Sequence, residues 1–453
     1  MKQNDMTFVN VSVIPMDREQ VISGQTLWVR DERIVAMGTA DQVEVPAGAE
    51  VIDGAGKYLM PGLADMHAHV FDPAALESLP NARELIPLAE GVDLQQLLLF
   101  VANGVTTIRD TASASDNILR LREGTNRGEL LGPRIFTGSA PMDGDPPLLP
   151  VTKPFSTAEA ARQYVRETAD KGYDFVKIYS TLPVEIFDAI MESAAEVGLP
   201  VAGHLPMPVD FEHALKKGMR SIEHLSGYDV ALLPDKQVAP TMDNIYMGHA
   251  FGTQEKIREL ARLTATYAVW NTPTLVIVEG VATDYGRPLV NNPRLRYMHP
   301  FFRQDDFLYE VFDARNRAVL KGCRDVRLAL VRELKKAGAP LLIGTDTPAT
   351  SQVVPGFSVH DELALFVEAG LSPYEALEAA TAEPARYFDR EGEFGTVQTG
   401  AVADLILLEA NPLRDITRTQ RRAGVMVRGQ WFPESELQSR LEEMVASFPT
   451  LSQ

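Results

Sequence analysis

Two histidines separated by one residue, His67 and His69, are the residues best placed in this sequence to bind a metal ion. In an extended strand, successive side chains alternate between two faces, so both imidazoles would lie on the same side of the chain. Such a pair can bind one divalent cation. The preceding Pro61-Gly62 interrupts any earlier strand, so we expect the pair on the first strand of a new unit. On its own the pair is weak evidence for a metal site.

Other polar residues stand at or near the carboxyl ends of strand-like runs. They are Lys177, His204, His224 and Asp346. The lysine interrupts the apolar run 175–179, where a buried ammonium is costly unless it is paired or modified. Each residue alone is more commonly a satisfied polar group of the core or its rim. Their occurrence at several strand ends together predicts an active site, because parallel barrels carry theirs at that face.

The short motifs around these residues resemble the amidohydrolase superfamily over nearly the full length of the chain. They are Pro-Gly-Leu-Ala-Asp-Met-His-Ala-His at 61–69, Thr-Thr-Ile-Arg-Asp at 106–110, Val-Lys-Ile-Tyr at 176–179, Ala-Gly-His at 202–204, Ile-Glu-His at 222–224 and Gly-Thr-Asp at 344–346. Within the superfamily, the chain resembles the imidazolonepropionase-like and prolidase-like branch. In prolidase-like members the lysine of the fourth strand is carboxylated by CO₂ and bridges two metal ions.

The resemblance implies two divalent metal ions, for which zinc is our expectation. Imidazole and carboxylate ligands suit zinc, and manganese, cobalt or iron also fit such a set. The implied ligands are His67, His69 and Asp346 for one ion, His204 and His224 for the other, and carboxylated Lys177 between them.

The chemistry expected of this site is hydrolysis of an amide bond. A carboxylated Lys177 is an anion, which removes the cost of a buried ammonium and supplies two oxygen ligands. Two adjacent cations lower the pKa of a bridging water, so that a metal-bridging hydroxide forms, and they polarise the scissile carbonyl. Asp346 would move a proton from that water to the leaving group as the catalytic acid and base. A dipeptide or an N-acyl amino acid is the expected small-molecule substrate.

Four residues are candidates for contact with the substrate. Tyr179 and Tyr228 flank metal ligands in sequence, and a phenol there could donate to a developing oxyanion, although packing in the rim is as good an interpretation. Asp143 stands where prolidase-like enzymes often have a Gly-Gly-His motif, so Xaa-Pro specificity is in doubt; it would favour a substrate amine or serve as a turn residue. Arg109, beside Asp110, fits a supporting pair better than a direct substrate contact.

Three other functions use the same features. A lactone, carbamate or phosphotriester hydrolase would need the same two ions. A deaminase of the superfamily usually keeps one ion and lacks the bridging lysine, so Lys177 argues against it. A non-catalytic scaffold of this fold would typically have lost metal ligands, whereas all six are present. Specificity resides in loops, so the sequence does not select one substrate.

The elements that position these residues predict an α/β fold, a (β/α)₈ TIM barrel. Strand-like and helix-like stretches alternate through the central part of the chain, which is typical of a parallel sheet. The eight expected strands are 62–67, 106–110, 134–138, 175–179, 200–204, 221–224, 269–275 and 341–346. Eight is the number that closes such a barrel.

Both ends of the chain are predicted to form a small β-sandwich domain. Residues 1–60 contain short strand-like runs, and residues 394–435 contain another set with punctuating glycines. The barrel would then span 61–393, and a C-terminal helix and tail would occupy 436–453. The stretch 276–338 is too long for a simple connection and is expected to contain an extra helical excursion, either a lid or an oligomer contact.

Composition limits the partners. The 453 residues carry a formal net charge of −19, and an acidic surface repels phosphate backbones and anionic lipids. Cys323 is the one cysteine, so no intrachain disulfide forms, and no apolar run is long enough to span a bilayer. No signal peptide is visible at the N-terminus, which favours a cytoplasmic enzyme, although an exported precursor that has been trimmed would look the same. We expect no nucleic-acid or membrane partner; a homo-oligomer remains open.

Overall fold

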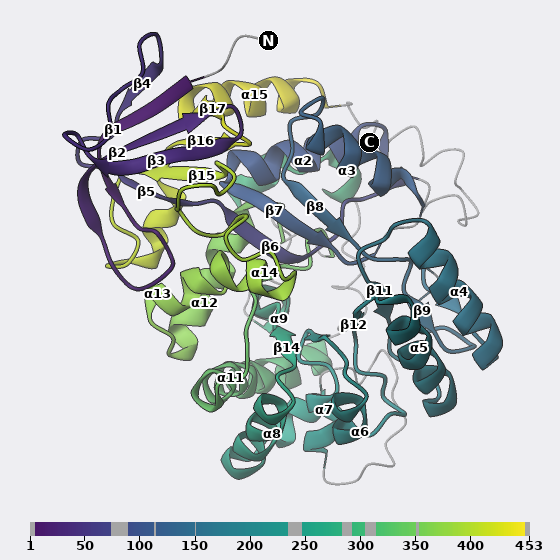
Figure 1. Ribbon diagram of the computed structural model, residues 1–453. Helices are drawn as coiled ribbons and strands as arrows, with labels where there is room; N and C mark the ends of the chain where they lie inside the picture. Colours follow the sequence, from purple (N-terminus) through teal and green to yellow (C-terminus); the bar gives the residue numbers. More distant parts are fainter. Residues whose placement is uncertain are drawn as a thin grey trace.

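The computed structural model describes residues 5–73, 89–112, 115–149, 151–233, 247–282, 292–303, 314–349 and 353–448. It is an α/β structure with two sheets of parallel strands in the central part of the chain and a third sheet built from both ends (Figure 1). The central strands are β6 (Leu63–Ala68), β7 (Val105–Asp110), β8 (Arg134–Thr137), β9 (Met142–Asp143), β10 (Lys153–Pro154), β11 (Val176–Ile178), β12 (Val201–Gly203), β13 (Ser221–Glu223) and β14 (Trp270–Thr272).

These strands pair in parallel and follow the order of the chain, except that β10 lies outside β9 at the edge of its sheet. One set runs β6-β7-β8, and the other runs β10-β9-β11-β12-β13-β14. A parallel bridge between Gly138 and Phe175 connects the two sets. Seven of the eight expected segments are confirmed as strands, although most are shorter than predicted. The two-residue strands β9 and β10 were not predicted.

The eighth segment, 341–346, contains no strand. Its backbone nevertheless hydrogen-bonds on both sides. The amide of Leu342 donates to Asn271 of β14 at 2.9 Å, and Met66 of β6 donates to the carbonyl of Ile343 at 2.8 Å. Parallel bridges pair Asn271 with Leu341 and Ala68 with Thr347. The segment ends at Asp346, which has a φ of 60°.

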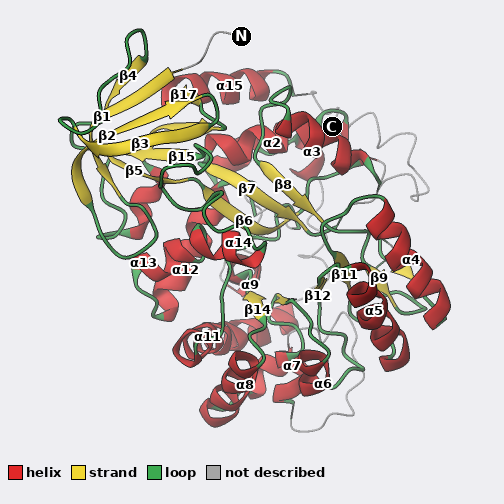
Figure 2. Ribbon diagram, in the orientation of Figure 1, coloured by secondary structure: helices red, strands yellow, loops and turns green. Residues whose placement is uncertain are grey.

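Helices lie around these strands (Figure 2). They are α2 (Val92–Ala102), α3 (Asn117–Asn126), α4 (Ala158–Asp170), α5 (Val184–Val197), α6 (Phe211–Lys216), α7 (Tyr228–Leu232), α8 (Gln254–Thr266), α9 (Leu275–Ala282), α11 (Ala314–Ala337), α12 (Phe357–Ala369), α13 (Pro373–Glu378) and α14 (Ala382–Tyr387), with 3₁₀ turns at Met247–Phe251, Pro293–Tyr297, Pro300–Arg303 and Ile416–Gln420. A single buried apolar cluster joins strand residues such as Ile108 and Ile222 to helix residues such as Phe187 and Phe366. This core fixes the strand ends relative to one another.

Strands from the two ends of the chain form one eight-stranded sheet. They are β1 (Asp5–Val13), β2 (Ile22–Arg30), β3 (Arg33–Thr39), β4 (Glu50–Asp53), β5 (Tyr58–Pro61), β15 (Leu405–Leu408), β16 (Arg422–Val427) and β17 (Gln430–Pro433). The purple and yellow-green strands lie side by side in Figure 1 because β15 pairs antiparallel with β5. The joining of both ends agrees with the sequence. The strands share one hydrogen-bonded sheet, so a two-layered sandwich is not confirmed.

The predicted C-terminal helix is α15 (Glu434–Ala446). Its residues Leu437 and Leu441 pack with Val425 and Phe432 of the mixed sheet and with Leu99 of α2. Helix α15 therefore connects the sheet to the barrel helices.

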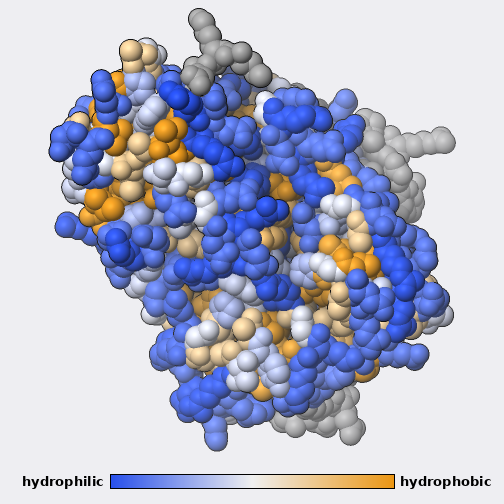
Figure 3. All heavy atoms as spheres, in the orientation of Figure 1, coloured by the Kyte–Doolittle hydropathy of each residue, from blue (hydrophilic) through white to orange (hydrophobic). Residues whose placement is uncertain are grey.

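The stretch after β14 contains helices, as predicted. Helix α9 follows β14 directly, and the long helix α11 returns to the eighth segment. From Cys323 onward, α11 contributes buried residues to the core. In the described residues no helix is both long enough and apolar enough to cross a membrane. The face shown in Figure 3 is largely hydrophilic, with small separate apolar areas, as the acidic composition leads us to expect.

Candidate metal centre

Three of the predicted ligands meet at one point. His67 lies in β6, His69 follows directly after it, and Asp346 ends the eighth segment, which pairs beside β6. One ligand atom from each of these residues lies within 4.8 Å of the others. Oδ1 of Asp346 is 2.7 Å from Nε2 of His69 and 3.2 Å from Nε2 of His67. The two imidazoles thus lie on the same side of the chain, as the alternation of side chains along a strand predicts.

The polar atoms of this cluster fit a divalent cation. Nε2 of His67 is buried and has no hydrogen-bond partner among the described residues, although it lies close to the Asp346 carboxylate. A buried nitrogen lone pair left in this way is costly unless a ligand satisfies it. Two imidazoles and one carboxylate are a donor set that suits zinc and related ions.

The Asp346 carboxylate is held in its ionised form. Burial alone would raise its pKa, but electrostatic interactions with His224 and His67, together with hydrogen bonds to His67 and His69, keep the pKa well below its usual range. An ionised carboxylate is the form that binds a metal or accepts a proton.

His204 and His224 lie next to this cluster, at the ends of β12 and β13. The ring centroid of His224 is 4.3 Å from that of His67 and 4.8 Å from that of His204. Each imidazole has a hydroxyl partner: Nδ1 of His204 is 2.8 Å from the Ser180 hydroxyl, and Nδ1 of His224 is 2.7 Å from the Thr274 hydroxyl. These contacts orient the rings, as outer hydrogen bonds commonly do for metal-binding histidines.

Burial keeps these histidines neutral. It lowers the pKa of His204 and His224 well below the ordinary range and also lowers that of His67, and the nearby Lys177 adds to the effect on all three. Neutral imidazole is the form that donates a lone pair to a metal. A cation can therefore bind to the cluster without first displacing protons from these imidazoles.

Lys177 lies in the middle of β11 and is 2% exposed. Burial lowers the pKa of its amine to about 8, against the opposing effect of the Glu223 and Asp346 carboxylates. The lysine therefore lies among the predicted ligands with an amine that loses its proton far more readily than usual. A neutral amine is also the form that reacts with CO₂.

The sequence analysis did not single out Glu223, which holds His67 in place. Its Oε2 is 2.7 Å from Nδ1 of His67, and its Oε1 accepts hydrogen bonds from Arg109 at 2.7 Å and from the Ser221 hydroxyl at 2.6 Å. Arg109 also donates to the carbonyl of Met66 at 2.6 Å. The signal was present, since Ser221 and Glu223 alternate with Ile222 and must share one face of β13.

The structure gives Arg109 a supporting position. Its guanidinium is fully buried and donates to groups of β6, β13 and β14, including the Thr272 hydroxyl at 3.1 Å. This agrees with the supporting role that the sequence analysis preferred. The direct contact with substrate that was also considered would require breaking this network.

Two other candidate substrate residues are used inside the protein. The hydroxyl of Tyr228, which is fully buried, lies 2.7 Å from the Thr264 hydroxyl and donates to Asn271 at 3.0 Å. Asp143 is also buried, and it accepts hydrogen bonds from the amide and hydroxyl of Thr181 and from the amide of Leu148. The structure thus gives these two residues packing and loop-fixing positions rather than a place among the ligands.

Tyr179 is brought to the ligands. It follows β11, is partly exposed, and its ring lies over that of His204 with centroids 4.1 Å apart. Of the four candidate substrate residues, it is the one whose ring contacts a predicted ligand and still has an exposed surface.

Glycine allows two close approaches near the ligands. At Gly203, directly before His204, the backbone has a φ of 142°, and a side chain would collide with the carbonyl of Ile178. At Gly344, a side chain would collide with Thr272 and with His67. The Gly-His and Gly-Thr-Asp motifs therefore reflect packing as well as chemistry.

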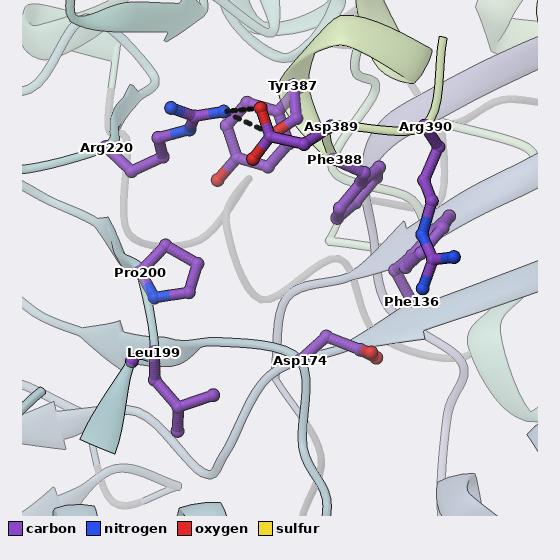
Figure 4. Close-up of a pocket in the computed structure, with 10 residues that line it drawn as sticks. Phe136, Asp174, Leu199, Pro200, Arg220, Tyr387, Phe388, Asp389 and Arg390 are labelled. Atoms are coloured by element: carbon purple, nitrogen blue, oxygen red, sulfur yellow. Dashed lines mark hydrogen bonds and ion pairs between the residues drawn. The ribbon is translucent and has the colours of Figure 1, made fainter. Parts of the chain in front are cut away.

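A separate cavity of about 390 Å³ lies at the other end of the barrel strands (Figure 4). Asp174, Pro200 and Arg220, which line it, come just before β11, β12 and β13. Its charged groups have protein partners: Arg220 lies 3.5 Å from Asp389, and Asp174 lies 2.9 Å from Arg122. The predicted ligands lie at the opposite ends of the same strands, so this cavity is not part of their site.

The fold and the site define a class of protein, an α/β protein of the TIM-barrel type with a candidate metal site. The model of the "Amidohydrolase family" matches residues 58–432. The chain belongs to this family and is therefore a hydrolase that acts on carbon–nitrogen bonds. Metal binding is typical of the family.

Known proteins agree with this assignment. The chain is 24% identical to ochratoxinase from Aspergillus niger over 79% of this chain and 71% of the relative. It is 26% identical to imidazolonepropionase from Rubrobacter xylanophilus over 88% and 87% of the two chains. The solved structure of a Xaa-Pro dipeptidase with bound methionine has the same fold, with a TM-score of 0.70 and 21% identity over 95% and 100%. The resemblance to the imidazolonepropionase-like and prolidase-like branch is thereby confirmed.

Proposed function

We propose that this chain is a hydrolase with two metal ions that cleaves an amide bond of a small substrate such as a dipeptide or an N-acyl amino acid. One observation carries the proposal: the donor atoms of His67, His69 and Asp346 converge, with a buried lysine nearby. The similar structure of a Xaa-Pro dipeptidase supports a peptide-like bond as the class of bond.

Six residues would hold the ions. The set is His67, His69 and Asp346 for one ion, His204 and His224 for the other, and Lys177, carboxylated by CO₂, between them. When bound, two divalent ions lower the pKa of a water and polarise the carbonyl to be attacked. Zinc suits these donors. The lowered pKa of Lys177 supports carboxylation, because a larger share of its amine is neutral near pH 8.

The chain's own groups would perform the proton transfer. Asp346 is ionised and lies at the centre of the histidines, so its carboxylate takes a proton from the attacking water and passes it to the leaving nitrogen. Glu223 accepts from His67 and keeps that ring oriented throughout. Tyr179, over the His204 ring, is the residue we assign to the substrate side.

We also propose that the eight parallel segments form a closed (β/α)₈ barrel of residues 61–393, with residues 1–60 and 394–435 as a separate small domain. The hydrogen bonds from the eighth segment to β14 and to β6 support closure. Closure would bring all six proposed ligands to one rim.

A substrate screen tests the proposed bond type. The metal-loaded enzyme would be assayed against dipeptides, N-acyl amino acids, lactones and phosphotriesters, with the Asp346→Asn variant as the control. We expect hydrolysis of amide substrates, lost in the variant. Turnover of lactones or phosphotriesters alone would contradict the proposed substrate class. Full activity of the variant would contradict the proton-transfer role of Asp346.

A further inference from the structure

Helix α11 places a buried arginine against the backbone of a proposed metal ligand. Arg327 is 2% exposed, and its guanidinium donates to the carbonyl of His224 at 2.8 Å and to the carbonyl of Pro273 at 2.6 Å. Those carbonyls belong to the segments that follow β13 and β14. One side chain therefore ties together two neighbouring loops beside the ligands.

The backbone at this point needs such support. His224 has a φ of 61°, Leu225 a φ of 56° and Thr274 a φ of 47°. Residues with side chains seldom adopt this left-handed conformation, and it persists where the surroundings hold it. The segment after β14 is held from the other side as well, because the buried carboxylate of Glu362 accepts from the amides of Leu275 and Val276 at 2.9 Å.

The same contacts specify which nitrogen of His224 carries its proton. The Thr274 hydroxyl has a single proton and donates it to the Pro273 carbonyl at 2.8 Å. With its proton on that carbonyl, the hydroxyl is an acceptor for Nδ1–H of His224, 2.7 Å away. That tautomer leaves the lone pair on Nε2. Arg327 holds the Pro273 carbonyl on which this arrangement depends.

We infer that Arg327 is a positioning residue, which fixes the backbone of His224 and, through Pro273 and Thr274, the tautomer that binds a metal. The inference rests on the proposed function, in which His224 holds the second ion together with His204. Arg327 acts through His224 and is not assigned any contact with the reacting atoms. Helix α11 would then serve the metal centre, although its sequence suggested a lid or an oligomer contact.

The first test measures the tautomer of His224 in metal-free protein. Nitrogen-15 NMR of the histidine side chains distinguishes Nδ1–H from Nε2–H. The variants are Arg327→Met, Arg327→Lys and Thr274→Val, of which the last keeps shape and removes only the hydroxyl. Arg332→Met is the matched control, because Arg332 lies on the same helix with its side chain 40% exposed.

We expect Nδ1–H in the parent protein and in the control, and a mixture of tautomers in Arg327→Met and Thr274→Val. Titration with Co²⁺, followed by its visible absorption, should show the second ion bound about 10- to 100-fold more weakly in these two variants. The affinity for the first ion should be unaffected. Arg327→Lys should restore part of the affinity. If Arg327→Met does not fold, Thr274→Val and Arg327→Lys still decide the matter.

Nε2–H on His224 of the parent protein would overturn the inference. An unchanged affinity for the second ion in Thr274→Val and Arg327→Lys would also overturn it. The two proposals fail in different ways. A parent protein that binds one ion, while the tautomer still depends on Thr274 and Arg327, would overturn the two-ion function and leave the positioning of His224 supported.

Discussion

The two ends of the barrel strands contain similar residue types in different surroundings. At the carboxyl ends, most of the charged and polar groups of the candidate metal centre are buried, and the pKa values of Asp346, His204 and His224 lie far from their ordinary range. At the amino ends, Arg220 and Asp389 face a cavity, and the Asp389 side chain is 87% exposed.

This difference shows that burial, more than residue type, separates a reactive site from a surface ion pair. An exposed pair is screened by water and contributes little. A buried set of neutral imidazoles and one carboxylate concentrates lone pairs at a point where water cannot satisfy them all.

The largest effect should follow Lys177→Ala. Without the lysine, no bridging carboxylate can form, so kcat should fall on the order of 10³-fold or more, since loss of one electrostatic stabiliser already costs about 10²- to 10³-fold. Short carboxylic acids added to the assay should restore part of the activity. Lys171→Ala is the control, because that lysine is exposed and pairs with Asp116 on the surface. Equal losses of kcat in both variants would contradict the proposed role of Lys177 in the site.

A smaller effect should follow Glu223→Gln. The change removes the charge that orients His67, so metal affinity should fall about 10- to 100-fold in a competition with a chelator. Asp188→Asn is the matched control, because Asp188 forms the same kind of contact with His213, at 2.7 Å, on a partly exposed surface. An unchanged affinity in Glu223→Gln would show that the buried contact does not orient the ligand.

Carboxylation of Lys177 should depend on pH. Since the pKa of its amine lies near 8 instead of 10.5, the neutral, reactive form should increase as the pH rises and comprise about half of the amine at pH 8. In metal-free protein supplied with ¹³C-labelled bicarbonate, the carbamate signal in NMR should therefore increase between about pH 7 and 9. A signal that grows only above pH 10 would show that burial does not activate this lysine.

The smallest effect should follow Asp389→Ala at the amino ends. Its contact with Arg220 is exposed, so the free energy of unfolding should change by less than about 1 kcal/mol, and activity should stay unchanged. Denaturant unfolding and a standard assay check both. A large loss of activity would show that the two ends of the strands are coupled.

The proposed ligands could be named from the sequence because each lies within a short local motif. His67 and His69 need only the alternation of a strand, and Asp346 follows an apolar run. The supporting residues were not predictable in this way. Arg327 contacts His224 across 103 positions of sequence, and its helix gives no local sign of that partner. Tertiary contacts of this kind depend on packing that no short motif specifies.

Parts of the fold were predictable for the same reason. Periodicity identified seven of the strands, whereas the eighth segment forms only isolated bridges and ends at a positive φ at Asp346. Tyr228 illustrates the limit for the site. Its place four residues after His224 suggested a substrate contact, but the helix that begins there turns its hydroxyl to Thr264 and Asn271 in the core.

The central claim is that His67, His69, Lys177, His204, His224 and Asp346 hold two ions around a carboxylated lysine. Elemental analysis of the purified protein after dialysis, combined with mass spectrometry of intact protein under conditions that preserve the carbamate, tests it directly. The account predicts close to two divalent ions per chain and a carboxyl group on Lys177. One ion per chain, with Lys177 unmodified, would contradict it.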